Sequence, residues 1–283
     1  MKKILSMFIT AALTLSAVMI LAGFGGPGRI MQSETEEQTA EDRAEHQGPM
    51  EPGAEVMGII RYSRTELGML TEFDVSNHQV NENGQITQFD LHRTRREKVL
   101  PDGSLLQDVD SEDSTISLEY GESGDILSAR TDIPGYCFTV HELTYTDGLI
   151  DTDAYDTDWC TSENPYKLQF TYEQSDGTVK RSEGKRLAGQ KSSYPCEYEY
   201  NETGDVTRII RTASPEFIVY MDIEYDENGC VTKITGTNPR GVFLICTFEY
   251  ESLGEVGKAG TAKSGFRKWQ EFSVIEEALK NCY

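Results

Sequence analysis

Apolar and polar residues alternate in short runs along most of the chain after residue 55, and turns that contain glycine separate these runs. In one run, Met221, Ile223 and Tyr225 fall on one side of an extended strand, while Asp222 and Glu224 fall on the opposite side. This period of two predicts an antiparallel sheet with an apolar face and an acidic, solvated face. Because an isolated hairpin is marginally stable, we expect consecutive hairpins to share the apolar face.

The turns recur at spacings of 19 to 29 residues, measured between their glycines. A fixed turn that returns at a period in the twenties predicts an internal repeat of β-hairpins. The predicted turns are Asn83-Gly84, Asp102-Gly103, Ser123-Gly124, Asp147-Gly148, Asp176-Gly177, Thr203-Gly204, Asn228-Gly229 and Leu253-Gly254.

The register of three hairpins follows from these turns. Asn-Gly is a strong signal for a two-residue hairpin loop, because both residues tolerate positive φ. Pairing outward from the last three turns sets opposite charges against each other on one face of each hairpin. The predicted pairs are Glu224–Lys233, Ile223–Ile234, Tyr225–Thr232, Glu199–Arg208, Tyr198–Ile209 and Glu249–Lys258.

A tyrosine precedes most of the turns. Two interpretations are open: these rings fill the core, or they form an exposed ladder that stacks on glycans. The predicted register favours the core, because it places the tyrosines on the apolar face. The residues are Tyr120, Tyr145, Tyr172, Tyr200, Tyr225 and Tyr250.

The predicted fold is all-β. Residues 56–265 form an antiparallel meander of β-hairpin repeats that makes one long twisted or curled sheet. The remaining segment, 266–283, begins with an aromatic and basic stretch, and Ser273 to Glu276 fits a capping box. This segment predicts a short helix over residues 274–281, packed as a lid over one end of the sheet, with Trp269 in the core.

The first 24 residues predict export. Lys2 and Lys3 precede an apolar run over residues 4–24, as in a signal peptide. Residues 21–23 resemble the lipobox of bacterial lipoproteins, but Phe24 stands where the lipid-bearing cysteine is required. Cleavage near residues 23–26 and retention as an N-terminal anchor both remain open. Either outcome predicts an extracytoplasmic protein, secreted or held at the outer face of the cell membrane.

Charge and composition limit the partners. Residues 25–55 lack apolar periodicity and predict a disordered acidic tether. The formal net charge of −22 disfavours nucleic acid and anionic membrane surfaces. We therefore expect membrane contact only through the N-terminal segment, and an extracellular protein or glycan as the partner.

One turn carries a resemblance to a known family. Residues 225–234 read Tyr-Asp-Glu-Asn-Gly-x-Val-x-x-Ile, and residues 200–209 match this pattern with Asn201 in the aspartate position. This pattern resembles the YD repeats of the RHS family, over roughly residues 78–260. The resemblance implies β-hairpins that wind into long sheets, often in shells or adhesins, and it supplies no catalytic residues. About eight turns are too few for such a closed shell.

Candidate catalytic chemistry is sparse. The four histidines, His46, His78, His92 and His141, lack metal-ligand spacing and are expected to be solvated or capping residues. No nucleophile-elbow, zinc-protease, P-loop or dinucleotide motif occurs in the sequence. Either buried thiols or one or more disulfides fit the six dispersed cysteines, Cys137, Cys160, Cys196, Cys230, Cys246 and Cys282.

Four aspartates have a regular spacing that suits calcium. Asp151, Asp153, Asp156 and Asp158 supply hard oxygen ligands from one segment. The EF-hand pattern needs an acid or Asn at its fifth position and Gly at its sixth, where Tyr155 and Asp156 stand. The segment therefore predicts either a structural calcium site or a solvated acidic loop.

Two functions follow from these patterns. The export signal, tether and repeats favour a non-enzymatic cell-surface protein that presents its sheet for binding or as a structural module. The alternative is a hydrolase that acts on an extracellular polymer through paired carboxylates, which would require a concave pocket with two acids close together.

Overall fold

The computed structural model describes residues 55–100, 102–107, 112–157, 166–186, 195–214, 216–255 and 265–280. The predicted signal and tether lie outside the described residues. The strands are β1 (Glu55–Glu66), β2 (Met69–Val80), β3 (Ile86–Val99), β4 (Leu105–Gln107), β5 (Asp113–Tyr120), β6 (Ile126–Ile133), β7 (Cys137–Thr146), β8 (Leu149–Thr157), β9 (Tyr166–Ser175), β10 (Thr178–Arg186), β11 (Cys196–Tyr200), β12 (Val206–Ser214), β13 (Phe217–Tyr225), β14 (Val231–Asn238) and β15 (Gly241–Glu255), and the helix is α2 (Phe266–Lys280).

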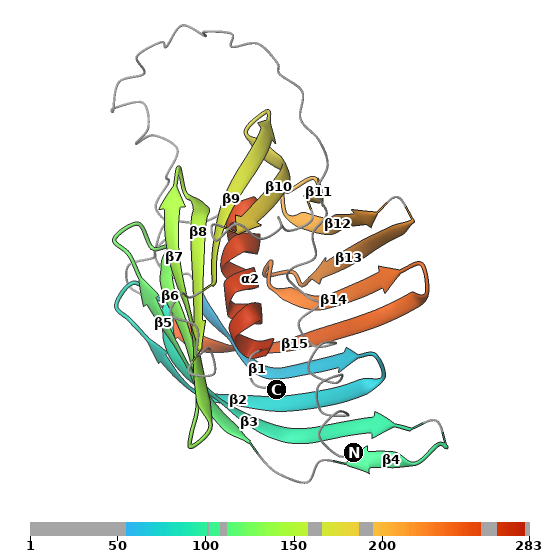
Figure 1. Ribbon diagram of the computed structural model, residues 1–283. Helices are drawn as coiled ribbons and strands as arrows, with labels where there is room; N and C mark the ends of the chain where they lie inside the picture. Colours follow the sequence, from blue (N-terminus) through green and yellow to red (C-terminus); the bar gives the residue numbers. More distant parts are fainter. Residues whose placement is uncertain are drawn as a thin grey trace, which may run out of the picture.

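The sheet is an antiparallel meander that closes on itself. Strands follow one another around a ring, β15 pairs with β1, and β2 pairs with β3, so that fourteen strands form a barrel and β4 extends β3 outside it (Figure 1). The predicted all-β meander is confirmed, and the predicted long twisted or curled sheet is corrected to a closed barrel. Closure satisfies the backbone groups that the edges of an open sheet would expose.

The predicted register is confirmed beyond the turns. Ile223 lies opposite Ile234, and Glu224 lies opposite Lys233. The prediction fails next to the turn, because Tyr225 lies opposite Val231 and not opposite Thr232. The Gly229 N–H donates to the Asp226 carbonyl at 3.2 Å and Gly229 has a φ of 76°, which makes a three-residue loop followed by a bulge. The bulge restores the register that a two-residue loop would have given.

One predicted turn is wrong. Strand β15 continues through Leu253-Gly254 to Glu255, and Glu249 lies opposite Arg61 of β1. Its predicted partner, Lys258, lies outside the described residues. The reason is the closure of the barrel, because pairing with β1 keeps this part of β15 extended.

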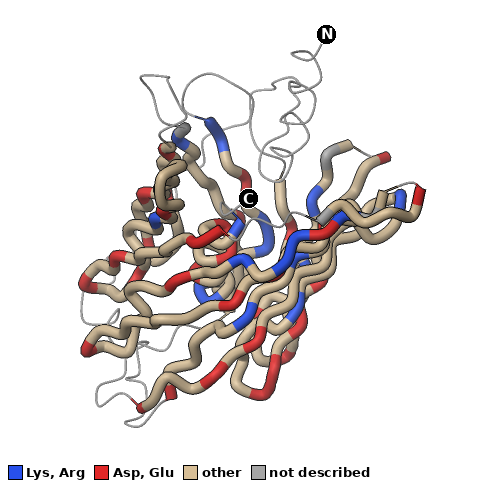
Figure 2. Tube along the Cα trace, turned by 90° about the horizontal axis from the view of Figure 1, so that it is seen from below, with Lys and Arg blue, Asp and Glu red and all other residues tan. Residues whose placement is uncertain are grey.

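The two faces of the sheet differ as predicted. Ile223 and Phe248 are buried in the barrel interior. On the outer wall, Lys233 lies 2.8 Å from Glu224, and charged residues continue along the strands (Figure 2). A membrane-spanning barrel carries an apolar band on its outside. The described outer wall has the opposite polarity and suits contact with water.

Helix α2 lies inside the barrel (Figure 1). It begins at Phe266, eight residues before the predicted start at Val274, and it is not a lid. Ser273 lies within the helix, where its hydroxyl donates to the Gln270 carbonyl at 2.8 Å, so the predicted capping box does not form. Burial of Phe266 in the barrel explains the earlier start, because tertiary packing supplies most helix stability in proteins. Of the described helices, none is long and apolar enough to cross a membrane.

Candidate functional site

Six tyrosines connect each hairpin to the next at one end of the barrel. Each phenol donates to a main-chain carbonyl two residues after the turn glycine of a preceding hairpin. The predicted core position is confirmed, and burial raises the pKa of these phenols, for Tyr200 to about 12. The donor–acceptor pairs are Tyr120–Ile86 (3.0 Å), Tyr145–Ile126 (2.7 Å), Tyr172–Ile150 (2.7 Å), Tyr200–Val179, Tyr225–Val206 (2.7 Å) and Tyr250–Val231 (2.8 Å).

The start of helix α2 packs against strands β9 and β11. The Phe266 ring meets Tyr172 and Tyr198 edge-on, with centroids 5.8 and 4.8 Å away. Gln270 Nε2 also donates to the Tyr172 hydroxyl at 2.9 Å. A barrel of eight strands is just filled by its own side chains, so one of fourteen has room for more than this helix.

A cavity of about 300 Å³ occupies the space beside the helix. Lys268, Glu271, Phe272 and Ile275 face it, at positions i, i+3, i+4 and i+7 of the helix. The opposite wall is mainly apolar and comes from strands β1, β2, β3, β5, β13, β14 and β15. Its residues include Ile59, Phe89, Leu118, Tyr225, Val231 and Tyr250.

Few polar groups reach this cavity. His78 stacks on Phe89 with ring centroids 5.9 Å apart, and burial lowers the pKa of His78. The lowered pKa keeps its ring uncharged at neutral pH. Lys268 Nζ lies 3.5 Å from Asp205, and within the described part of the chain Glu271 is the one carboxylate that lines the cavity. The site therefore suits a mostly apolar guest.

Trp269 and Cys230 also line the cavity. Trp269 packs against the core, as predicted, but it also borders the open space. Burial and the charge of Asp226 raise the pKa of the Cys230 thiol to about 11. Cys230 is half-buried and Cys246 is buried, and both are free thiols, which agrees with the interpretation of a buried thiol for Cys246.

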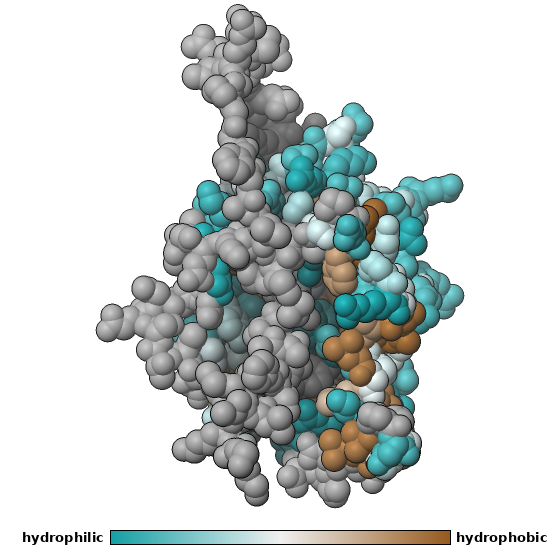
Figure 3. Space-filling view, turned by 45° about the vertical axis from the view of Figure 1, so that its right-hand side comes forward, coloured by the Kyte–Doolittle hydropathy of each residue, from teal (hydrophilic) through white to brown (hydrophobic). Residues whose placement is uncertain are grey.

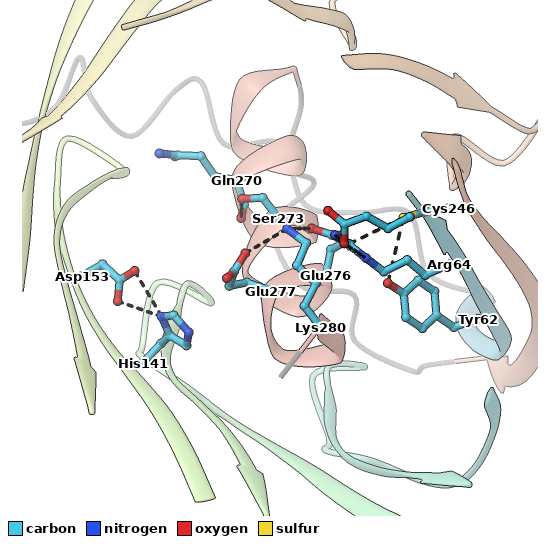
Figure 4. Close-up of polar contacts among 11 residues, drawn as sticks. Tyr62, Arg64, His141, Asp153, Cys246, Gln270, Ser273, Glu276, Glu277 and Lys280 are labelled. Atoms are coloured by element: carbon cyan, nitrogen blue, oxygen red, sulfur yellow. Dashed lines mark hydrogen bonds and ion pairs between the residues drawn. The ribbon is translucent and has the colours of Figure 1, made fainter. Parts of the chain in front are cut away.

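A second group of polar residues fixes the other half of the helix (Figure 4). Arg64 of β1 is 4% exposed and lies 2.7 Å from Glu66 and 3.3 Å from Glu276 of the helix. Lys280 approaches Glu276 at 2.5 Å and Glu277 at 2.9 Å. This arrangement is a closed network of ion pairs, and it anchors α2 to the wall.

Charge in this network shifts the pKa of Glu277. Burial alone would raise the pKa of its carboxyl, but the positive charges of Lys280 and His141 outweigh burial and lower it to about 2. Conversely, Glu276 and Glu277 outweigh the burial of Lys280 and raise the pKa of its ammonium group. Both groups are therefore charged at neutral pH.

His141 is buried, contrary to the prediction that the histidines are solvated or capping. It is 7% exposed, its Nδ1 lies 3.0 Å from Asp153, and its ring lies 4.8 Å from that of Tyr155. Burial lowers its pKa, but hydrogen bonding and charge from Asp153 outweigh this effect and raise it. Its Nε2 has no hydrogen-bond partner within the described residues, so no nucleophile completes a triad there.

The four predicted calcium ligands are only partly described. Asp151, Asp153 and Asp156 lie on strand β8 and not in a loop, while Asp158 lies outside the described residues. Asp153 pairs with His141, and Asp156 accepts a hydrogen bond from the Thr157 N–H at 2.8 Å. No group of three or more candidate ligands comes together among the residues that the structure describes. Calcium at these positions stays a prediction.

The cavity itself was missed from the sequence. Because the sequence predicts the helix over residues 274–281 only, it does not place Lys268 and Phe272 on the same helix as Ile275. The spacings of four residues from Lys268 to Phe272 and three residues from Phe272 to Ile275 place these side chains on one face of a helix. The wall residues carried no such signal, because their alternation also fits an ordinary core.

Comparisons with models of known families and with curated proteins found no match. The chain is similar to a solved porin-like protein from Bacteroides uniformis ATCC 8492, with 10% identity, a TM-score of 0.36, and coverage of 68% of this chain and 96% of that chain. It is also similar to a Photorhabdus luminescens Tc holotoxin pore, with 10% identity and a TM-score of 0.22, over 66% of this chain and 12% of that chain. At these scores neither likeness identifies a family or a function, and the resemblance to YD repeats stays a prediction.

Proposed function

We propose that the protein is an exported, non-enzymatic binding protein that holds a small apolar molecule inside its barrel. The observation that carries this proposal is the cavity between α2 and the barrel wall. Its volume of about 300 Å³ lies at the lower end of the range for small-molecule pockets. Its apolar lining with a few polar side chains is also typical of such pockets.

The position of the cavity favours binding over a purely structural role. Leu118 and Phe89 in its wall belong to the buried core, so the cavity adjoins the apolar interior of the barrel. The cavity is partly open, and each Å² of apolar guest surface that it buries contributes roughly 25 cal/mol to binding. The aromatic rings of Tyr250, Phe272 and Trp269 add flat surfaces on which a planar or chain-like guest could pack.

The hydrolase alternative finds less support. It requires two carboxylates within reach of each other in a pocket. Among the described residues that line the cavity, Glu271 has no second acid beside it. The acid pairs of the strands lie on the outer wall, where Glu224 and Asp222 face Lys233 and Arg208.

Location is part of the proposal. The apolar run over residues 4–24 after Lys2 and Lys3 supports export, and the charged outer wall suits an aqueous compartment. An extracellular protein or glycan as a further partner stays a prediction.

The test is binding of the fluorescent probe N-phenyl-1-naphthylamine to the purified full chain. We expect saturable enhancement of its emission, and at least tenfold weaker binding to Ile275→Trp, which fills the cavity. Met57→Trp fills it from the wall and serves as a second variant, with circular dichroism to verify folding. The control is Val242→Trp, since Val242 is 59% exposed and lies away from the cavity. Equal affinity in all four proteins would contradict the proposal.

A further inference from the structure

Large exposed apolar residues gather at one end of the barrel. Of the eight such residues in the described chain, six lie at the end opposite the tyrosine-bearing turns. We call these six the apolar rim. They are Leu67 (71% exposed), Tyr136 (62%), Val242 (59%), Leu105 (55%), Leu106 (55%) and Phe217 (36%).

Most of the apolar rim comes from neighbouring hairpins. The hairpins β12–β13, β14–β15, β1–β2 and β3–β4 follow one another around the sheet and end on the same side (right in Figure 1). The Leu67 N–H donates to the Phe243 carbonyl at 2.9 Å, which holds the tips of two of these hairpins together. Figure 3 turns this side forward and shows apolar surface in separate patches among polar residues.

Charge is distributed unequally between the two ends. Each described turn that follows a strand at the tyrosine end contains an acid and no base. On the apolar rim, the β1–β2 tip is Leu67-Gly68, and the β14–β15 tip carries Arg240. The β3–β4 and β12–β13 tips carry one acid each, Asp102 and Glu216. Among the described residues, the turns at the tyrosine end are therefore more acidic than the tips at the rim. The acidic turn residues are Glu82, Glu122, Asp147, Asp176, Glu202 and Asp226.

We propose that the apolar rim is a membrane-docking face that rests on the surface of a lipid bilayer. Its side chains stand on separate hairpin tips and form no groove, which suits a soft, flat partner better than a shaped protein surface. Apolar side chains at a bilayer surface enter the boundary between headgroups and acyl chains. The acidic turns then point away from the lipid, so the net charge opposes this contact least in this orientation.

The chain before β1 is compatible with this orientation. Residues 25–54 separate the apolar run over 4–24 from Glu55, the first residue of β1. At about 3.3 Å per extended residue, these 30 residues span up to about 100 Å. If the N-terminal segment lies in the membrane, the linker is therefore long enough for either end of the barrel to face the lipid. The apolar rim then determines which end does so.

The test places a tryptophan at each end of the full chain. Val242→Trp lies on the apolar rim, and Val80→Trp, at a residue 37% exposed next to the tyrosine-end turn 81–85, is its matched control. Each variant is bound through its own N-terminal segment to zwitterionic phosphatidylcholine vesicles with or without brominated acyl chains. Emission of the parent chain is subtracted. We expect brominated lipid to quench Val242→Trp by at least half and to leave Val80→Trp unchanged.

Four outcomes overturn the proposal. Equal quenching of the two tryptophans, or quenching of neither, shows that the rim does not select the membrane. A Val242→Trp spectrum that shifts to the blue with rising protein concentration, before vesicles are added, shows that the rim joins copies of the chain. Introducing Leu67→Asp into Val242→Trp should abolish the lipid quenching, and its persistence also contradicts membrane docking.

Discussion

Tyr225 donates its phenolic hydrogen to the main-chain carbonyl of Val206, which lies 2.7 Å away beside the turn of the preceding hairpin. Five other tyrosines make the equivalent bond around the same end of the barrel. This bond requires a phenolic hydroxyl, which phenylalanine lacks. The ring fills the core, while the hydroxyl satisfies a buried carbonyl at the neighbouring bulge.

Removing one of these hydroxyls should destabilise the barrel. For Tyr225→Phe we expect a loss of about 1–3 kcal/mol in the free energy of unfolding, because the Val206 carbonyl loses its partner in a buried site. Urea denaturation monitored by circular dichroism measures this change. The control is Tyr220→Phe on the same strand, whose ring faces Arg208 on the outer wall. A similar effect of both substitutions would contradict the role of the tyrosine bond.

Breaking the buried ion network should cost more than breaking a surface pair. Arg64→Met leaves Glu276, which is 6% exposed, with less compensating charge, and we expect a loss of about 3–5 kcal/mol in unfolding free energy. Adding Glu276→Met to the Arg64→Met variant should recover part of the lost unfolding free energy, because no unpaired buried carboxylate then remains. Lys233→Met, which removes an exposed pair with Glu224, should change little. Guanidinium denaturation of the parent chain and the three variants measures these differences, and an unrecovered double variant would argue against the pairing.

Stability should depend on the charge of Glu277 in acid. Its pKa in the folded chain is lowered from 4.5 to about 2, so its contribution to stability is complete above pH 4.5 and is lost as the pH falls through 2. The stability difference between the parent chain and Glu277→Gln should therefore shrink over this interval. Urea denaturation at several pH values measures it. A difference that stays constant down to pH 2 would show that this carboxylate is not held in its charged form.

The thiols of Cys230 and Cys246 should report on the cavity. Burial raises the pKa of Cys230 to about 11 and that of Cys246 to about 12, so both should react slowly with iodoacetamide at pH 8. Only Cys230 lines the cavity. Saturating N-phenyl-1-naphthylamine should slow its modification severalfold and leave Cys246 unchanged, as followed by peptide mass spectrometry. Equal protection of both thiols would indicate a general change in stability and not a guest beside Cys230.

The sequence predicts the local parts of this fold well. Alternation and turn chemistry act over a few residues, so the pairing of Ile223 with Ile234 follows from Asn228-Gly229 alone. The bulge that places Tyr225 opposite Val231 could not be predicted in this way, because the Asn-Gly dipeptide occurs in both two-residue and three-residue loops.

Contacts between distant residues could not be predicted. Tyr62 pairs with Phe248 across the closure of the barrel, and no periodicity links two strands so far apart in the chain. The turn expected at Leu253-Gly254 failed for this reason. The cavity depends on the same closure and on the insertion of α2, so neither its volume nor its lining was visible in the sequence.

The pairing of β1 with β15 has a consequence for how the molecule is made. The seam of the cylinder joins the first described strand to the last, so a nascent chain cannot close its barrel until β15 has been synthesised. Such sequence-distant pairing slows folding, and until it occurs both unpaired margins can recruit other chains. A polypeptide with this seam is well suited to crossing a membrane unfolded and assembling afterwards.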